Sequence, residues 1–236
     1  MKKIFVFDID DTMYDQQHAF GRALNNLVIN EKQLNIPALY QLMKEYGDEA
    51  FSEGFDKKKL KAMQIFRIQR ALQDYNIQIT EEQAIQFQLD FEDYQNEIQL
   101  FPKMEELLDL LVNEQQIIGI ITNGTIKKQS KKITMLNLDK WFPQNRMFIS
   151  EKVGISKPEK FIFEQFEKKL DFPINKQHFY YIGDNYQNDI VGPKSVGWHT
   201  IWVNYRGYRE EKESLSDYIV HSPDELLSVV QRLVYK

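Results

Sequence analysis

The sequence contains no cysteine, which excludes disulfide bonds and thiolate zinc sites and leaves no sign of an oxidising compartment. It also lacks a long apolar run, because no stretch approaches the roughly 20 residues of a membrane-spanning helix. The amino terminus, MKKIFVFDID, is too short and too acidic for a signal peptide. An excess of positive charge is lacking as well: 30 Lys and Arg face 35 Asp and Glu, the formal net charge is −5 and the pI is about 5.5, which disfavours binding to a nucleic-acid polymer. These absences predict a cytoplasmic protein with neither a membrane nor a nucleic-acid partner.

Length and composition bound the number of domains. The chain has 236 residues, of which 42% are hydrophobic, and this suits one large domain or a core domain with a smaller insertion. Charged residues make up 28%, a share that does not indicate disorder.

Short runs rich in β-branched and aromatic residues predict buried strands. These runs are Ile4–Phe7, Ile117–Ile121, Met147–Ile149, Phe179–Ile182, His199–Val203 and the less apolar Tyr218–Val220. Amphipathic helical patterns separate most of them, at Met104–Glu114, at Glu159–Leu170 with Pro158 suited to its first turn, and at Glu225–Leu233. Because strands alternate with helices, we expect an α/β fold whose core is a Rossmann-like parallel sheet covered on both faces.

Residues 15–100 interrupt this alternation, because they contain no convincing strand. Their amphipathic patterns predict helices at Gln16–Asn30, Leu60–Tyr75 and Glu81–Ile98. Thr80 with Gln83 is typical of a capping box at the start of the last of these. We therefore expect residues 1–14 and 101–236 to form the α/β core, and residues 15–100 to form an inserted, all-helical domain.

Polar residues follow several of the predicted strands. Asp8, Asp10, Thr122, Asp184 and Asp189 come directly after strands, and Lys157 precedes a helix. In a parallel sheet the carboxyl ends of the strands meet at one edge, which is where ligands bind. Acidic groups crowded there cost free energy unless a cation offsets them. The pattern predicts a site for carboxylate and metal chemistry, whereas Asp11 more simply fits a turn.

Together these residues resemble the four motifs of the haloacid dehalogenase-like hydrolases, a family of aspartate-nucleophile phosphatases. The DIDDT stretch matches D-x-D-x-T, and Thr122-Asn123-Gly124 matches the second motif. Lys157-Pro158 matches the third, and Gly183-Asp184 with Asp189 matches the fourth. Each motif alone has a plain structural explanation, such as a turn or a helix cap, but four in order are far more specific. The resemblance also implies that the helical insertion is a cap, a lid that sets substrate specificity.

The resemblance implies a role for each residue of the site. Asp8 would attack phosphorus and form an aspartyl-phosphate, and Asp10 would serve as general acid and then as general base. Lys157, the Thr122 hydroxyl and Asn123 would bind the phosphoryl group together with nearby backbone N–H groups. The presence of Asp10 favours phosphate esters over halide displacement, since dehalogenases of this family lack the second aspartate.

A divalent cation completes the expected site. Mg²⁺ would bridge Asp8, Asp184 and a phosphate oxygen, and the resemblance adds the backbone carbonyl of Asp10 as a ligand. Asp189 is expected to support the metal site or Lys157 from outside the ligand shell.

The expected function is Mg²⁺-dependent hydrolysis of a small phosphorylated metabolite, such as a nucleoside 5′-monophosphate, by a monomer or homodimer. A sugar-phosphate phosphatase or a phosphosugar mutase is an alternative, although such mutases tend to carry Gly-Val where this chain has Asp11-Thr12. A second alternative is a non-catalytic module that binds or senses a phosphorylated ligand. Four phenylalanines of the insertion could stack on a base, but we expect such residues to pack its own core: Phe20, Phe51, Phe55 and Phe66.

Overall fold

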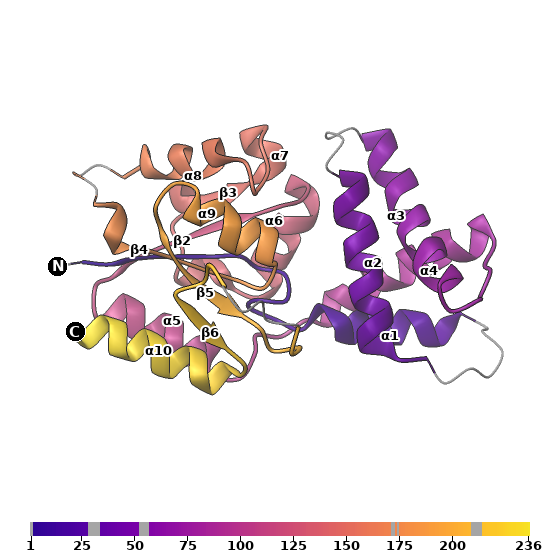
Figure 1. The fold of residues 1–236 in the computed structure, drawn as a ribbon, viewed down its shortest axis with the longest axis horizontal. Helices are drawn as coiled ribbons and strands as arrows, with labels where there is room; N and C mark the ends of the chain where they lie inside the picture. Colours follow the sequence, from indigo (N-terminus) through magenta and orange to yellow (C-terminus); the bar gives the residue numbers. More distant parts are fainter. Residues whose placement is uncertain (1, 28–33, 52–56, 171–172, 174, 209–213) are drawn as a thin grey trace. The chain divides into compact units, whose positions relative to one another are not determined.

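The chain folds into two compact units. The computed structural model describes residues 2–27, 34–51, 57–170, 173, 175–208 and 214–236 (Figure 1). One unit comprises Met1–Asp15 and Gln99–Lys236, and the other comprises Gln16–Ile98. The chain therefore leaves the first unit just after the acidic segment and returns to it before the second strand. No helix in the described ranges has the length and apolar character needed to cross a membrane.

The first unit is built on one parallel sheet. Its strands are β1 (Ile4–Phe7), β2 (Ile117–Thr122), β3 (Met147–Ile149), β4 (Phe179–Gly183), β5 (His199–Val203) and β6 (Tyr218–Val220). They lie in the order β3-β2-β1-β4-β5-β6, and every neighbouring pair is parallel. The predicted parallel α/β fold is confirmed. Helices cover both faces of the sheet, so side chains on both faces of its central strands are buried. These strands therefore consist of continuous apolar runs instead of alternating apolar and polar residues.

Strand β1 occupies the middle of the sheet, between β2 and β4. Ile4 and Val6 face a core that includes Phe163, on the opposite side from Phe5, which stacks on Tyr180 with 5.4 Å between the ring centroids. The chain runs from β1 towards β3 on one side and later adds β4 on the other, so the order of the strands reverses beside β1. Ligands in such sheets bind at this reversal, next to the carboxyl end of β1.

Helices cover both faces of the sheet, with α8 on one face and α5 and α10 on the other (Figure 1). The α-helices of this unit are α5 (Met104–Asn113), α6 (Ile126–Met135), α7 (Ser150–Val153), α8 (Lys160–Glu167), α9 (Gly192–Lys194) and α10 (Pro223–Tyr235). Helix α6 was not predicted. Pro158 lies outside α8 rather than in its first turn, because the helix begins at Lys160 with Glu159 as its N-cap.

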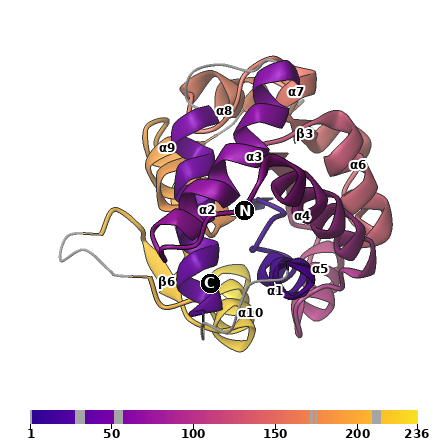
Figure 2. The same cartoon turned by 90° about the vertical axis from the view of Figure 1, so that its right-hand side faces the viewer.

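The second unit consists of helices around its own apolar core. They are α1 (Gln16–Asn26), α2 (Ile36–Phe51), α3 (Lys57–Gln73) and α4 (Glu81–Tyr94), followed by the short 3₁₀ helix η1 (Gln95–Glu97). Helix α2 packs along α3, and α1 packs along α4 (Figure 2). The capping box of Thr80 and Gln83 is formed as predicted. Helix α2 was not predicted, because Pro37 and Gly47 obscure its pattern, although Pro37 occupies a first helical turn where proline is tolerated.

Candidate active site

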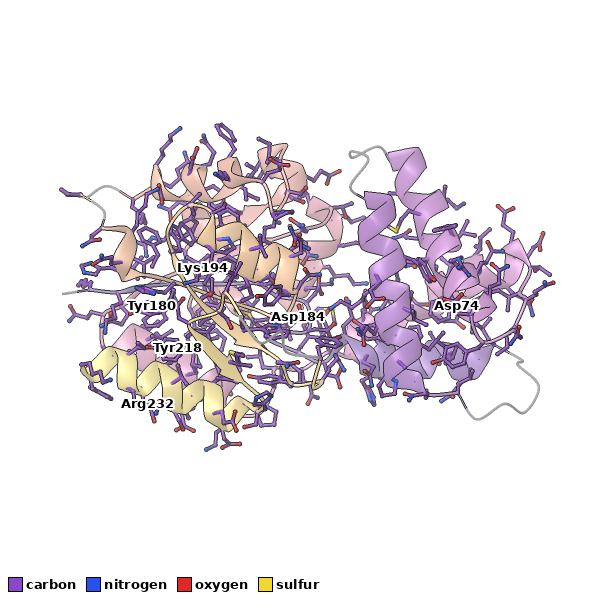
Figure 3. All side chains as sticks on the ribbon, in the orientation of Figure 1. Asp74, Tyr180, Asp184, Lys194, Tyr218 and Arg232 are labelled. Atoms are coloured by element: carbon purple, nitrogen blue, oxygen red, sulfur yellow. The ribbon has the colours of Figure 1, made fainter. Side chains whose placement is uncertain are left out.

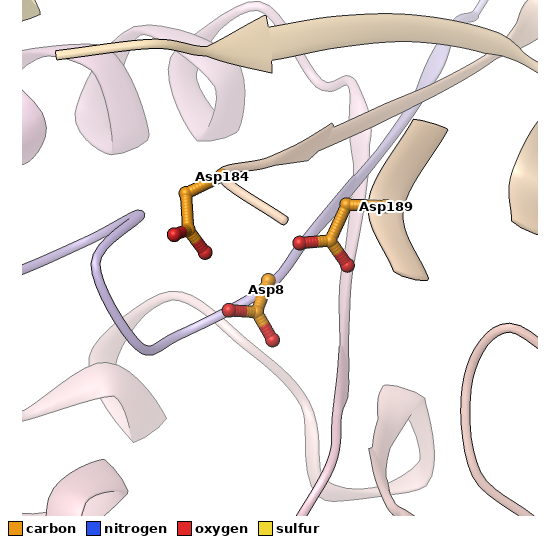
Figure 4. A group of neighbouring side chains, drawn as sticks. All are labelled: Asp8, Asp184 and Asp189. Carbon is orange, nitrogen blue, oxygen red and sulfur yellow. The ribbon is translucent and has the colours of Figure 1, made fainter. Parts of the chain in front are cut away.

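Three buried carboxylates converge at the carboxyl edge of the sheet. Asp8 directly follows β1, Asp184 directly follows β4, and Asp189 lies in the π-helical turn η5 (Tyr186–Val191). Each offers an oxygen within 4.8 Å of the others, and Figure 4 shows the three side chains grouped together, with Asp184 and Asp189 extending toward Asp8. Asp184 lies at the end of β4 opposite to Tyr180 (Figure 3). Carboxylates that are crowded and buried repel one another, and a divalent cation offsets this repulsion. Because the ligand atoms are oxygens, a hard cation such as Mg²⁺ suits the cluster.

Lys157 is the ammonium group that faces this cluster. Its Nζ lies 2.7 Å from Oδ1 of Asp8 and 2.7 Å from Oδ1 of Asp189, and it donates to the hydroxyl of Tyr181 at 2.9 Å. Tyr181 in turn donates to the carbonyl of Ile121 at 2.7 Å. Tyr181 was not predicted as part of the site, because a tyrosine inside a buried strand gives no local sign of a polar contact.

Charge and burial shift the acidity of these groups. Burial raises the pKa of Asp8 to about 7, against the attraction of Lys157 and with help from the charges of Asp189 and Asp10. Burial acts to lower the pKa of Lys157, but the charges of Asp189 and Asp8 outweigh it and hold that pKa well above its ordinary value. Lys157 thus contacts two of the three clustered carboxylates, Asp8 and Asp189, and a metal ion at the cluster would offset negative charge further.

Gly183 makes the position of Asp189 possible. A Cβ atom at Gly183 would lie 2.4 Å from Cγ of Asp189, so any side chain there would displace the carboxylate. Asp189 also accepts a hydrogen bond from the backbone N–H of Asn185 at 3.0 Å. It is thus bound both to Lys157 and to the loop that carries Asp184, which suits a supporting group better than a group free to coordinate a metal.

The last residue of β2, Thr122, and the first residue after it, Asn123, lie at the same edge. The hydroxyl of Thr122 is buried and has no hydrogen-bond partner within the described part of the chain, as expected of a group that binds a ligand. The side chain of Asn123 binds the backbone of Lys157. Its amide accepts from the backbone N–H of Lys157 and donates to the Lys157 carbonyl, both at 2.9 Å. This side chain therefore positions Lys157, and only the backbone of Asn123 is left for phosphate.

Asp10 lies in a separate set of contacts. Its Oδ1 accepts from Nζ of Lys132 at 2.5 Å and from the hydroxyl of Tyr14, and its Oδ2 accepts from Nε2 of Gln129 at 3.0 Å. Burial raises the pKa of Asp10, but Lys132 and the hydrogen bonds outweigh it, so the pKa lies below its ordinary value. Lys132, Gln129 and Tyr14 were not predicted. The available signal was the spacing of three residues between Gln129 and Lys132, which places both on one face of a helix.

Asp11 has the structural role that its position suggested. It is buried, adopts a left-handed backbone conformation with φ of 58°, and is paired with Arg206. Arg206 also lies 2.8 Å from Asp15, so it ties together the two ends of the turn after β1. Beside these residues a cavity of about 140 Å³ reaches Asp184, which leaves room for a ligand at this edge of the sheet.

Comparison with known proteins identifies the family. Residues 5–203 match the family described as haloacid dehalogenase-like hydrolase. The chain belongs to this family. The fold is similar to the crystal structure of the HAD-hydrolase YfnB of Bacillus subtilis bound to magnesium, with a TM-score of 0.73. The two sequences are 25% identical, and the match covers 98% of this chain and 99% of YfnB.

Two enzymes are similar over almost the whole of this haloacid dehalogenase-like hydrolase. The glyceraldehyde 3-phosphate phosphatase of Pyrococcus furiosus is 30% identical, with 98% of this chain and 93% of that enzyme covered. The pyrimidine 5′-nucleotidase PynA of Streptococcus pneumoniae is 25% identical, with 98% of this chain and 95% of that enzyme covered. The predicted family is therefore confirmed, and the similarity includes the helical unit.

Proposed function

We propose that this protein is a Mg²⁺-dependent phosphatase that hydrolyses small phosphate monoesters through an aspartyl-phosphate on Asp8. The observation that carries the proposal is the buried cluster of Asp8, Asp184 and Asp189 around Lys157, with Asp10 two residues beyond Asp8. Relatives named as phosphatases and nucleotidases support the same reaction. They also favour hydrolysis over the mutase and the non-catalytic alternatives.

In the first half-reaction an Asp8 oxygen attacks phosphorus, and the bond from phosphorus to the ester oxygen breaks. Asp10 in its protonated form, a strong acid because its pKa is lowered, donates a proton to the departing oxygen. The Lys157 ammonium and the Thr122 hydroxyl hold the oxygens of the transferring group, with the backbone N–H of Asn123 beside them. Thr122 fits this role because its buried hydroxyl has no other hydrogen-bond partner in the described part of the chain.

In the second half-reaction water attacks the phosphorus of the aspartyl-phosphate. The carboxylate of Asp10 takes the proton of this water, phosphate leaves, and the Asp8 carboxylate is restored. Asp8, Asp184 and the backbone carbonyl of Asp10 would hold Mg²⁺, which when bound offsets negative charge on the phosphoryl group. Asp189 stays with Lys157, to which it is bound at 2.7 Å.

We propose that the helical unit is the cap that selects the substrate. The two similar enzymes are named for a triose phosphate and for pyrimidine 5′-nucleotides, so both classes are candidate substrates. Phe20 is buried in the core of this unit and offers no stacking surface, whereas Phe66 is 47% exposed. The Phe51 side chain and Phe55 lie outside the described residues. We further propose that the enzyme acts in the cytoplasm, where phosphorylated metabolites are made, as a monomer or homodimer.

A substrate panel tests this function. The purified chain with Mg²⁺ is assayed for phosphate release from 4-nitrophenyl phosphate, glyceraldehyde 3-phosphate, other sugar phosphates and purine and pyrimidine 5′-monophosphates. We expect turnover of the aryl ester and a strong preference for one metabolite class. Absence of turnover across the panel, together with tight binding of a phosphorylated compound, would favour the non-catalytic alternative.

A further inference from the structure

The carboxylate of Asp10 is fixed by side chains from two parts of the chain. Tyr14 comes from the turn after β1, and Gln129 and Lys132 come from α6, more than 100 residues later. Lys132 and Tyr14 donate to Oδ1, and Gln129 donates to Oδ2. With donors on both oxygens, the plane of the carboxylate is defined as well as its position.

The start of α6 is arranged so that these two side chains reach Asp10. Thr125 caps the helix directly after the turn that follows β2, by accepting from the backbone N–H of Lys128 at 3.2 Å. The side chain of Gln129 packs against Gly124 in that turn, and its Nε2 donates to the carbonyl of Asn123 at 3.0 Å. A Cβ atom at Gly124 would lie 2.7 Å from Nε2 of Gln129, so the absence of a side chain at Gly124 provides the space.

The burial of Lys132 is the unusual feature of this helix. Lys132 is only 6% exposed, whereas the neighbouring Lys131 on the same helix is exposed. Burying an ammonium costs free energy unless an anion compensates it, and the anion here is Asp10. A lysine that served only to solubilise α6 would point to water, as Lys131 does.

We propose that Lys132 and Gln129 are positioning residues that hold the carboxylate of Asp10 in the orientation needed to transfer protons at the reacting phosphate ester. This inference rests on the proposed function, in which Asp10 is the general acid and base. Lys132 acts through Asp10 and contributes nothing when Asp10 cannot transfer a proton. Its contribution also grows with the basicity of the leaving group, because a more basic leaving oxygen depends more on the acid.

A double-mutant cycle on the full chain with Mg²⁺ tests this. Lys132→Met is made in the wild-type chain and in the Asp10→Asn chain, and kcat/KM is measured with 4-nitrophenyl phosphate. We expect a loss of about 10–100-fold in the wild-type background and less than about a 2-fold loss in the Asp10→Asn background. The loss should be larger with phenyl phosphate, whose leaving group is more basic. Lys131→Met is the matched control and should keep the wild-type kcat/KM.

The outcomes separate this inference from the proposed function. An equal loss in both backgrounds, or an equal loss with both esters, shows that Lys132 only supports the fold, and the inference is then wrong. The same holds if Lys132→Met has wild-type activity. A wild-type chain without phosphatase activity, or an Asp10→Asn chain with full activity on phenyl phosphate, overturns the proposed function itself. If Lys132→Met folds poorly by tryptophan fluorescence, Gln129→Leu takes its place in the same cycle.

Discussion

The ammonium nitrogen of Lys157 lies 2.7 Å from Oδ1 of Asp8, and the two residues are 149 positions apart in the sequence. Both side chains are almost completely buried, at 2% and 8% exposed. The pair joins the strand that carries the proposed nucleophile to the loop before α8. It also presents a positive charge where the phosphoryl group is expected, so stability and activity should both depend on it.

Replacing Lys157 with methionine should lower both the free energy of unfolding and the catalytic rate. The change leaves buried carboxylates without their ammonium partner, which typically costs about 3–5 kcal/mol. It also removes a donor to the transferring group, for which we expect a loss of at least about 100-fold in kcat. Urea unfolding at about pH 8 without metal measures the first effect by tryptophan fluorescence, since all three tryptophans (Trp141, Trp198 and Trp202) belong to the α/β unit. Lys160→Met, at an exposed position, should match wild type in both measurements.

The raised pKa of Asp8 predicts how stability depends on pH in the absence of metal. The pKa is about 7 in the folded protein against an ordinary value of 3.8, so the folded state binds this proton more tightly than the unfolded state. The stability contributed by the bound proton is complete below pH 3.8 and is lost as the pH rises through about 7, at no more than about 1.4 kcal/mol per pH unit. Asp8→Asn should therefore gain stability relative to wild type between about pH 4 and pH 7, with a constant difference above that range. A difference that is independent of pH would contradict the shift.

Metal removal should abolish turnover. The carboxylates of Asp8 and Asp184 are expected to share Mg²⁺, so excess chelator should stop phosphate release and added Mg²⁺ should restore it. Asp184→Asn removes a charged ligand and should raise the Mg²⁺ concentration needed for half-maximal activity at least about 10-fold. Asp139→Asn, at an exposed position, is the control. Undiminished turnover in chelator, or equal Mg²⁺ requirements in the two variants, would show that the cluster has another purpose.

Gly183→Ala should misplace Asp189. The added methyl group would meet Cγ of Asp189 at 2.4 Å, and the carboxylate would have to move away from Lys157. We expect a destabilisation of about 1–3 kcal/mol and a clear drop in kcat, measured by urea unfolding and phosphate release. Gly21→Ala is a suitable comparison, because its Cβ would meet only an ordinary contact at 3.7 Å. If Gly183→Ala behaves like Gly21→Ala, the close packing of Asp189 against β4 does not matter for the site.

Local sequence patterns were sufficient to predict the strands of the sheet and the polar residues at its carboxyl edge. Continuous apolar runs such as Ile4–Phe7 are typical of buried parallel strands, and the strand ends then locate Asp8, Thr122 and Asp184. Helix α2 was missed because a proline and a glycine interrupt its pattern, although packing against α3 stabilises it. In this case tertiary contacts outweigh local propensity.

The missed parts of the site depend on contacts between distant segments. Lys132 and Asp10 are 122 residues apart, and a lysine on an amphipathic helix is normally solvated. The two hydrogen bonds between the side chain of Asn123 and the backbone of Lys157 also link separate loops, 34 residues apart. An Asn-Gly pair on its own indicates only a turn. Such partners become visible only once the sheet has brought the segments together.

Detection of phosphate on Asp8 is the most direct test of the proposed mechanism. The chain with Mg²⁺ and 4-nitrophenyl phosphate is quenched in acid within the first turnovers, digested, and analysed by mass spectrometry. We predict one added phosphoryl group on the peptide that contains Asp8, sensitive to hydroxylamine as acyl phosphates are, and absent from Asp8→Asn. A phosphoryl group on another residue, or steady turnover by Asp8→Asn, would contradict the assignment of Asp8 as the nucleophile.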